Sequence, residues 1–269
     1  MQGEKNMEKN IYLKDSNGFI GKEYQSEVEK IKEKYKDWFD TIEELNKIIY
    51  DMYDDIILKE NDEIGMFLIT EFTKIHKSFQ ACSLLYSYGL EDDVQIILRT
   101  MFDSLFISAS IKKDEKNFDK LIKNQEIENN MKINDLIDLG IITDREKINV
   151  NIREKTSTWK FAQDTEYKDM YIAYSYLSSY VHVDLMTLKE KYYEEDGEIG
   201  IIIAPSVNNI CFFLTEILGL MLSYVELITT YLKKDYEKEL SKIKLKHIQL
   251  KKISEEIYEK QEKEKKQKI

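Results

Sequence analysis

Residues 96–111 read IILRTMFDSLFISASI, a stretch that is apolar on nearly every side when wound into a helix. A helix without a polar face needs neighbours all around it, so this stretch predicts a central, buried helix. We expect that helix to run over 91–113, because Glu91, Asp92 and Asp93 suit the positive end of a helix.

The composition of the 269 residues favours an all-α fold. The chain holds 1 Pro and 9 Gly, so residues that interrupt helices are rare. Hydrophobic residues make up 42% of it, which is enough for a core. Its 2 Cys exclude a disulfide framework and a cysteine-rich zinc site.

Apolar spacing outward from 91–113 predicts a bundle of five to six main helices with a small β-hairpin insert. Asp62 suits a helix N-cap and Gly89 a helix end, and the turn signal Asp196-Gly197 marks the hairpin. The further main helices are expected over 22–58, 61–89, 114–139, 166–181 and 206–232, and the hairpin over 188–204.

The two ends of the chain carry long apolar stripes. Apolar residues recur in alternating steps of three and four over 22–58, which fits a coiled-coil-like arm or, as we prefer, a long bundle helix. The segment from Lys233 onward contains 13 Lys and 8 acidic residues. It stays amphipathic to about Tyr258, and we expect the helix to fray beyond that residue. We therefore expect three regions, 1–60, 61–232 and 233–269, and a homodimer joined through the terminal helices.

Charge and hydropathy bear on partners and location. The net charge of −11 disfavours broad contact with nucleic acid phosphates, which relies on Lys and Arg. The most membrane-like run, 210–228, contains Glu216 and Glu226, and is expected to be a buried helix instead. With no signal peptide at the polar start, we expect a cytoplasmic protein without membrane contact.

Arg99 is the first candidate site residue. A guanidinium keeps its charge, so burying it among apolar neighbours demands a partner, and Asp103 lies one helical turn away. Two interpretations stay open here: a buried ion pair that fixes helix packing, or an Arg held by Asp103 at a pocket floor and aimed at an anion.

A second candidate column lies in 171–182. Steps of four align Tyr174, Ser178 and His182, with Tyr171 at the upstream end. His182 is either a helix-end residue or a general acid/base, and Ser178 lacks the orienting acid of a hydrolase triad.

The other two histidines carry less weight. His76 is expected to be partly exposed, and neither it nor His247 stands at metal-ligand spacing. No metal or other cofactor is therefore predicted.

The order Gly89, Arg99, Asp103, Tyr174, Ser178 and His182 resembles bacterial domain-of-unknown-function family 5677, over about 67–232. That family typically has Glu where this chain has Asp103. The resemblance implies an all-helical fold, and some members look like components of anti-phage defence. A looser similarity is to HEPN domains, many of which are ribonucleases with Arg and His four to six residues apart on one helix. In this chain Tyr176 and Leu177 lie six and five residues before His182, where such an Arg would stand. Only Arg99, from another helix, could therefore take the role of that Arg.

These observations lead to two functional expectations. The first is a helical ligand- or partner-binding subunit, in a defence system as the resemblance implies. Its pocket for a small anionic ligand or RNA would combine Asp103, Tyr174 and Tyr171 with Arg99, Ser178 and His182. The alternative is a metal-independent HEPN-like ribonuclease or nucleotide-processing effector, in which His182 and Arg99 act with Ser178. The residues alone leave open whether the protein is an enzyme.

Overall fold

α-Helices form most of the described chain, and this confirms the all-α prediction. The computed structural model describes residues 18–181, 192–195, 198–201, 207 and 209–267. In chain order its helices are α1 (Gln25–Lys34), α2 (Lys36–Tyr53), α3 (Glu63–Ser87), α4 (Glu91–Lys113), α5 (Lys116–Asp138), α6 (Thr158–Ala162), α7 (Tyr171–Val181), α9 (Ile210–Ile228) and α10 (Glu237–Gln267). Two short strands, β1 (Tyr192–Glu195) and β2 (Glu198–Ile201), pair antiparallel with Tyr192 opposite Ile201.

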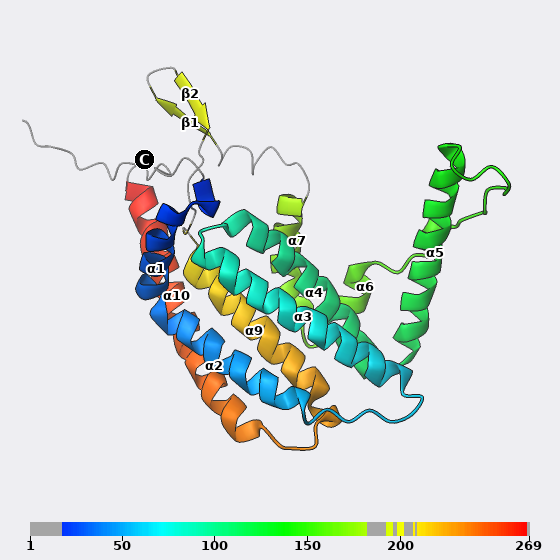
Figure 1. Cartoon of the computed structure of the whole chain (residues 1–269), viewed down its shortest axis with the longest axis horizontal. Coiled ribbons are helices and arrows are strands. Elements are labelled where there is room, and N and C mark those ends of the chain that lie inside the picture. Colours follow the sequence, from blue (N-terminus) through cyan, green and yellow to red (C-terminus); the bar gives the residue numbers. More distant parts are fainter. Residues whose placement is uncertain (1–17, 182–191, 196–197, 202–206, 208, 268–269) are drawn as a thin grey trace, which may run out of the picture.

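Helix α9 lies at the centre of the bundle, where α2, α3, α4 and α10 all pack against it (Figure 1). Leu214, Ile217 and Leu218 on this helix have no exposed surface, and α4 is also buried along most of its length. The segments 91–113 and 210–231 are long and apolar enough to cross a membrane, a test that buried core helices also pass. In this fold 67% of the most apolar part of the first segment is buried, and 72% of that of the second.

Local signals set the helix ends where the sequence predicted them. The Asp62 carboxylate accepts a hydrogen bond from the Gly65 N–H at 2.7 Å and so caps α3. Gly89 follows α3 with φ +67°, and Gly140 follows α5 with φ +69°. Both take the left-handed backbone conformation that glycine adopts without steric cost.

The predicted single helix over 22–58 is two helices, with a break at Tyr35 (φ −112°, ψ 31°). Val28 before the break and Leu45 after it are both buried. The apolar spacing therefore continues across the break, which is why periodicity gave no sign of it. At the other terminus α10 continues to Gln267, past the fraying expected after Tyr258, because Glu, Lys and Gln have high helix propensity.

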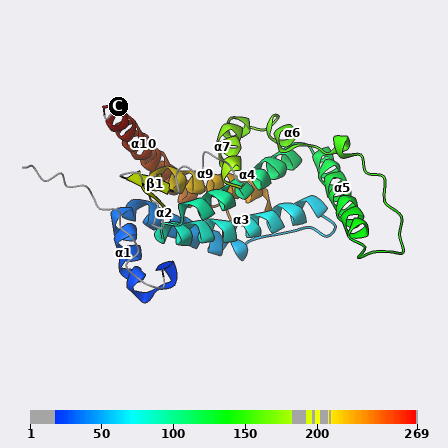
Figure 2. The same cartoon turned by 90° about the horizontal axis from the view of Figure 1, so that it is seen from above.

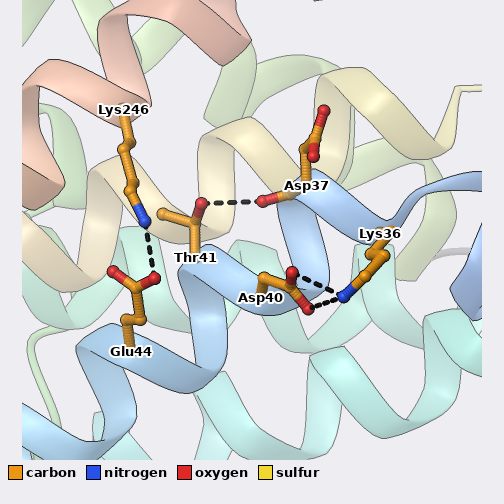
Figure 3. Close-up of polar contacts among 6 residues, drawn as sticks. All are labelled: Lys36, Asp37, Asp40, Thr41, Glu44 and Lys246. Atoms are coloured by element: carbon orange, nitrogen blue, oxygen red, sulfur yellow. Dashed lines mark hydrogen bonds and ion pairs between the residues drawn. The ribbon is translucent and has the colours of Figure 1, made fainter.

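Helix α10 packs along α2, so a helix from the N-terminal part of the described chain and its last helix lie side by side (Figure 1). Figure 2 shows that the end of α10 and helix α1 point away from each other. Lys246 of α10 forms an ion pair with Glu44 of α2 at 2.5 Å (Figure 3). The same close-up shows two contacts within α2, the Lys36–Asp40 ion pair and the hydrogen bond that Thr41 donates to the Asp37 carbonyl.

The apolar stripes of the terminal helices are used within one chain. Ile49 of α2 and Ile243 of α10 are at most 1% exposed, and both belong to the main core. At the loop ends the Tyr236 hydroxyl donates to the Asp55 carboxylate at 2.6 Å. Contacts within one chain therefore bury much of the apolar surface from which the sequence predicts a dimer through the terminal helices.

Candidate functional site

Arg99 of α4 lies where α4, α6 and α7 meet, and each of its three guanidinium nitrogens has a protein partner. Nη1 forms an ion pair with Asp103 Oδ2 at 3.2 Å. Nη2 donates to the Tyr174 hydroxyl at 3.0 Å, and Nε donates to Ser178 Oγ at 3.3 Å. The guanidinium carbon also lies 5.1 Å from the centre of the Tyr174 ring, within the range of a cation–π contact.

This geometry follows from two simple helix repeats. Asp103 is one turn after Arg99 on α4, and Ser178 is one turn after Tyr174 on α7, so each pair shares a helix face. Packing α7 on α4 then brings the two faces together. The cluster is fixed in position because three contacts in different directions leave the planar guanidinium little freedom to rotate.

Asp103 and Tyr174 are held by further contacts. Thr158 of α6 donates to Asp103 Oδ1 at 2.9 Å, so the carboxylate has a partner on each oxygen. Burial raises the pKa of the Tyr174 phenol, and the negative charge of Asp103 adds to that effect. The phenol therefore stays protonated at neutral pH and can both donate and accept a hydrogen bond.

Aromatic rings close one side of the cluster. The Tyr171 ring lies 5.0 Å from that of Tyr174 and 4.9 Å from that of Trp159, measured between ring centres. Phe106 of α4 packs edge-on against Tyr174 at 5.9 Å. These rings support Tyr174, whose own ring lies against the guanidinium of Arg99.

The Arg99–Asp103 pair is partly open to solvent, with 22% and 26% of the two side chains exposed. The sequence left open a buried ion pair or an Arg at a pocket floor, and the observed exposure of the pair is intermediate between full burial and full exposure. Tyr174 is 7% exposed and Ser178 is partly buried. The Arg99 side chain is therefore accessible to solvent over part of its surface.

The structure brings together five of the predicted site residues, which are Arg99, Asp103, Tyr171, Tyr174 and Ser178. His182, the sixth, lies outside the described residues, so its geometry is not part of the observed cluster. Sequence reasoning missed Thr158, which lies outside the segments 96–111 and 171–182 that supplied the candidate residues.

The Ser178 hydroxyl donates to the Tyr174 backbone carbonyl at 3.0 Å while it accepts from Arg99. Its hydrogen is therefore directed into α7 rather than toward a base in the described part of the chain. A hydroxyl in this arrangement suits ligand contact better than nucleophilic attack, which needs an adjacent base to take the proton.

The polar face of α4 continues toward its N-terminus in further steps of four. Gln95 and Glu91, four and eight residues before Arg99, are 2% and 4% exposed. Gln95 Nε2 donates to Glu91 Oε1 at 3.5 Å, and Asn209 Nδ2 donates to the same oxygen at 3.2 Å. This extension was also missed, although the spacing from Arg99 was a visible signal.

The other described histidines are structural. His76 is 3% exposed, so the expectation of a partly exposed ring was wrong. Its Nδ1 lies 2.9 Å from the Tyr53 hydroxyl and its Nε2 lies 2.8 Å from Asn46 Oδ1, both on α2. Burial lowers the pKa of His76 to about 4, so the ring is neutral at neutral pH. A hydrogen on Nε2 then satisfies both contacts, with Nε2 donating to Asn46 Oδ1 and the Tyr53 hydroxyl donating to Nδ1.

His247 of α10 makes one contact with the core helix, from its Nε2 to the Thr215 carbonyl at 3.1 Å. Burial lowers the pKa of this ring as well. Within the described ranges, no group of three or more His, Cys, Asp or Glu side chains is arranged to hold a metal ion.

Comparison with known proteins gives one match. The model of a protein family described as a family of unknown function (DUF5677) matches residues 65–200, which is half of the chain. No curated protein and no solved structure matches the sequence. The matched span contains nearly all of α3 and the whole of α4 to α7, and so includes every described residue of the Arg99 cluster.

Proposed function

The chain belongs to the DUF5677 family of unknown function, and on that premise we propose that it is a helical binding subunit whose Arg99 cluster holds an anionic group of a ligand or partner. The observation that carries the proposal is the partly exposed Arg99 side chain, whose guanidinium is fixed by Asp103, Tyr174 and Ser178. A structural ion pair alone would need only the first of these contacts.

The guanidinium has donor capacity left after its protein contacts. It carries five N–H groups, and three of them suffice for the observed contacts. The remaining hydrogens on Nη1 and Nη2 are suited to the two oxygens of a carboxylate or phosphate. The Tyr174 hydroxyl accepts only one hydrogen of Nη2, so the second hydrogen of that nitrogen is left for a ligand oxygen.

The surroundings favour a small or local anionic group over an extended polyanion. The chain has a net charge of −11, and its only arginines are Arg99, Arg145 and Arg153. Long nucleic acids are held by many Lys and Arg contacts along the backbone, which an acidic surface opposes. A single nucleotide, a phosphorylated side chain or a carboxylate needs only one such fork.

Binding of anionic probes to Arg99 variants tests this proposal. Inorganic phosphate, adenosine monophosphate and a short RNA are titrated against the wild type, Arg99→Lys and Tyr174→Phe by calorimetry, and Arg153→Ala is the control. We expect at least one probe to bind the wild type and the control, with Arg99→Lys weakening it about tenfold or more because an ammonium lacks the planar fork. Equal binding by Arg99→Lys would overturn the proposal.

The alternative proposal is a HEPN-like ribonuclease, and it is favoured by one feature. Ser178, which contacts Arg99, comes four residues before His182 in the sequence. In that case His182→Ala and Arg99→Ala each abolish cleavage of RNA by the folded protein. If His182→Ala keeps full cellular activity, the enzyme alternative is excluded and the binding proposal stands. A role in phage defence, implied by family resemblance, is tested by plaque counts with the wild type and Arg99→Lys.

A further inference from the structure

Trp159 of α6 is an exposed aromatic side chain beside the Arg99 cluster. The residue is 44% exposed, although tryptophan is on average highly buried in folded proteins. The other tryptophan of the chain, Trp38, is 6% exposed, and its indole N–H donates to Thr215 Oγ1 at 2.9 Å. Packing in the core therefore accounts for Trp38 and does not account for Trp159.

Short contacts hold Trp159 next to the cluster. The preceding residue, Thr158, donates to the Asp103 carboxylate at 2.9 Å, and Asp103 is the ion-pair partner of Arg99. The Trp159 ring packs against that of Tyr171, with ring centres 4.9 Å apart. Helices α6 and α7 both pack on α4, and Figure 2 shows them on the same side of it. The indole therefore has a defined place relative to the guanidinium.

A row of aromatic rings leads from Trp159 to Arg99. The Tyr171 ring, which contacts Trp159, lies 5.0 Å from that of Tyr174. The Tyr174 ring in turn lies 5.1 Å from the guanidinium carbon of Arg99. Two rings therefore stand between the indole and the guanidinium in this row. Both ends of the row keep exposed surface, since 22% of the Arg99 side chain and 44% of Trp159 are exposed.

From this arrangement we propose that the ligand of the Arg99 cluster is a mononucleotide, with its phosphate on Arg99 and its base stacked on Trp159. The assignment rests on the proposed function of the same site and names the class of ligand. An exposed indole offers a surface on which a base stacks, and the guanidinium suits the oxygens of a phosphate. Because two rings separate these groups, a ligand that contacts both needs a spacer between ring and acid. The ribose of a nucleotide is such a spacer.

A purely supporting role for Trp159 predicts a different pattern of binding. If the indole only held Tyr171 in place, and through it Tyr174, its loss would loosen the cluster and weaken the binding of every anion alike. A stacking surface instead contributes only to ligands that carry a ring. Probes that share a phosphate and differ in the ring therefore separate the two roles.

Calorimetry on the full-length protein with two matched probes tests the proposal. Adenosine 5′-monophosphate (AMP) and ribose 5-phosphate carry the same sugar and phosphate, and only AMP has a base. We expect AMP to bind the wild type about tenfold or more tightly than ribose 5-phosphate, because stacking adds to the phosphate contact. In Trp159→Ala the affinity for AMP should fall to that for ribose 5-phosphate, whose own affinity should not change.

Three further variants complete the comparison. Trp159→Phe keeps an aromatic ring and should retain most of the preference for AMP. Arg99→Lys should weaken both probes, because both use the phosphate contact. Phe212→Ala is the matched control, since it removes another aromatic side chain that is 44% exposed, on α9, and it should bind AMP as the wild type does.

Fluorescence gives a second readout that a supporting role would not move. The chain has 2 Trp, so the emission that is lost in Trp159→Phe belongs to Trp159. In the wild type, AMP should protect this part of the emission from quenching by acrylamide, and ribose 5-phosphate should not. The emission of Trp38, which remains in Trp159→Phe, should respond to neither probe.

The failure of this inference is distinct from the failure of the proposed function. Equal affinity of the wild type for AMP and ribose 5-phosphate, with both weakened by Arg99→Lys, would overturn the inference and leave the proposed function standing. An equal loss of both probes in Trp159→Ala would also overturn it, because Trp159 would then act only as a support. Binding of neither probe to the wild type would overturn the inference and the proposed function together.

Discussion

The Arg99 guanidinium meets Tyr174 twice, as a hydrogen-bond donor to its hydroxyl at 3.0 Å and as a cation 5.1 Å from its ring centre. These residues are 75 positions apart in the chain. The contact therefore ties α4 to α7, and it explains why one arginine in the apolar stretch 96–111 is tolerated. It also places the aromatic and charged parts of the candidate site in one rigid unit.

Removing either member of the Arg99–Asp103 pair should destabilise the fold by about 1–3 kcal/mol, the cost of leaving a partly buried polar group without its partner. This is less than the ~3–5 kcal/mol of a fully buried pair, because about a quarter of each side chain is exposed. The double variant Arg99→Ala with Asp103→Ala should lose less than the two single losses combined. Urea unfolding of all four proteins measures the coupling, and strictly additive losses would show that the pair is not coupled.

Protonation of His76 should weaken the fold in mild acid. Burial lowers the pKa of His76 to about 4 from an ordinary value of 6.5, so the unfolded chain binds a proton that the native chain does not between these values. The neutral ring makes its full contribution to the free energy of unfolding above pH 6.5. That free energy falls by about 2 kcal/mol as the pH drops toward 4, a value that allows for partial solvation of the ring.

Urea unfolding at pH 7.5 and pH 5 measures this loss, and His76→Gln is the matched variant. Glutamine cannot take up the proton, so this variant should lose distinctly less stability between the two pH values than the wild type does. Identical pH dependence in the two proteins would contradict the assignment.

Alanine at Gly65 should destabilise the protein although alanine favours helices. An added Cβ would lie 2.6 Å from Asp62 Oδ2 and 2.8 Å from Tyr231 Cε1, so the α3 cap or the ring must move. We expect a net loss of about 1–2 kcal/mol, as strain of ~1–3 kcal/mol outweighs a helix-propensity gain of ~1 kcal/mol.

Gly219→Ala provides the comparison in a second helix. Its Cβ would lie 3.2 Å from His247 Nε2, a milder contact that a small ring shift relieves. Its loss in the same urea experiment should therefore be smaller. A Gly65→Ala variant as stable as the wild type would show that the cap yields without strain.

A fragment limited to the family-matched span 65–200 should not fold by itself. The span omits α9, whose Leu214, Ile217 and Leu218 have no exposed surface at the bundle centre. Without α9 the apolar faces of α3 and α4 are uncovered, which removes the main driving force for folding. Cooperative urea unfolding of this fragment, with sharp near-ultraviolet circular dichroism, would contradict the prediction, and the chain 18–267 is the positive control.

Several features could be predicted because they depend on residues close in the chain. Asp62, Gly89 and Gly140 mark helix ends by their own backbone chemistry, and they do so wherever the helix packs. The Arg99–Asp103 pair belongs to the same class, since residues four apart on a helix meet regardless of the fold. Nearly all-helical structure followed from the scarcity of Pro and Gly, and needed no knowledge of contacts.

Other features depended on which helices pack together, and no local pattern specified them. The break at Tyr35 leaves the apolar spacing intact, and His76 is buried only because α2 supplies Tyr53 and Asn46 as partners. Thr158 reaches Asp103 across 55 positions of sequence. The sequence by itself therefore determined the helices and the residues that share each face, because hydrogen bonding and side-chain periodicity act over a few residues. Only the tertiary structure decided which faces meet, because that choice depends on how side-chain shapes fit together across the whole core.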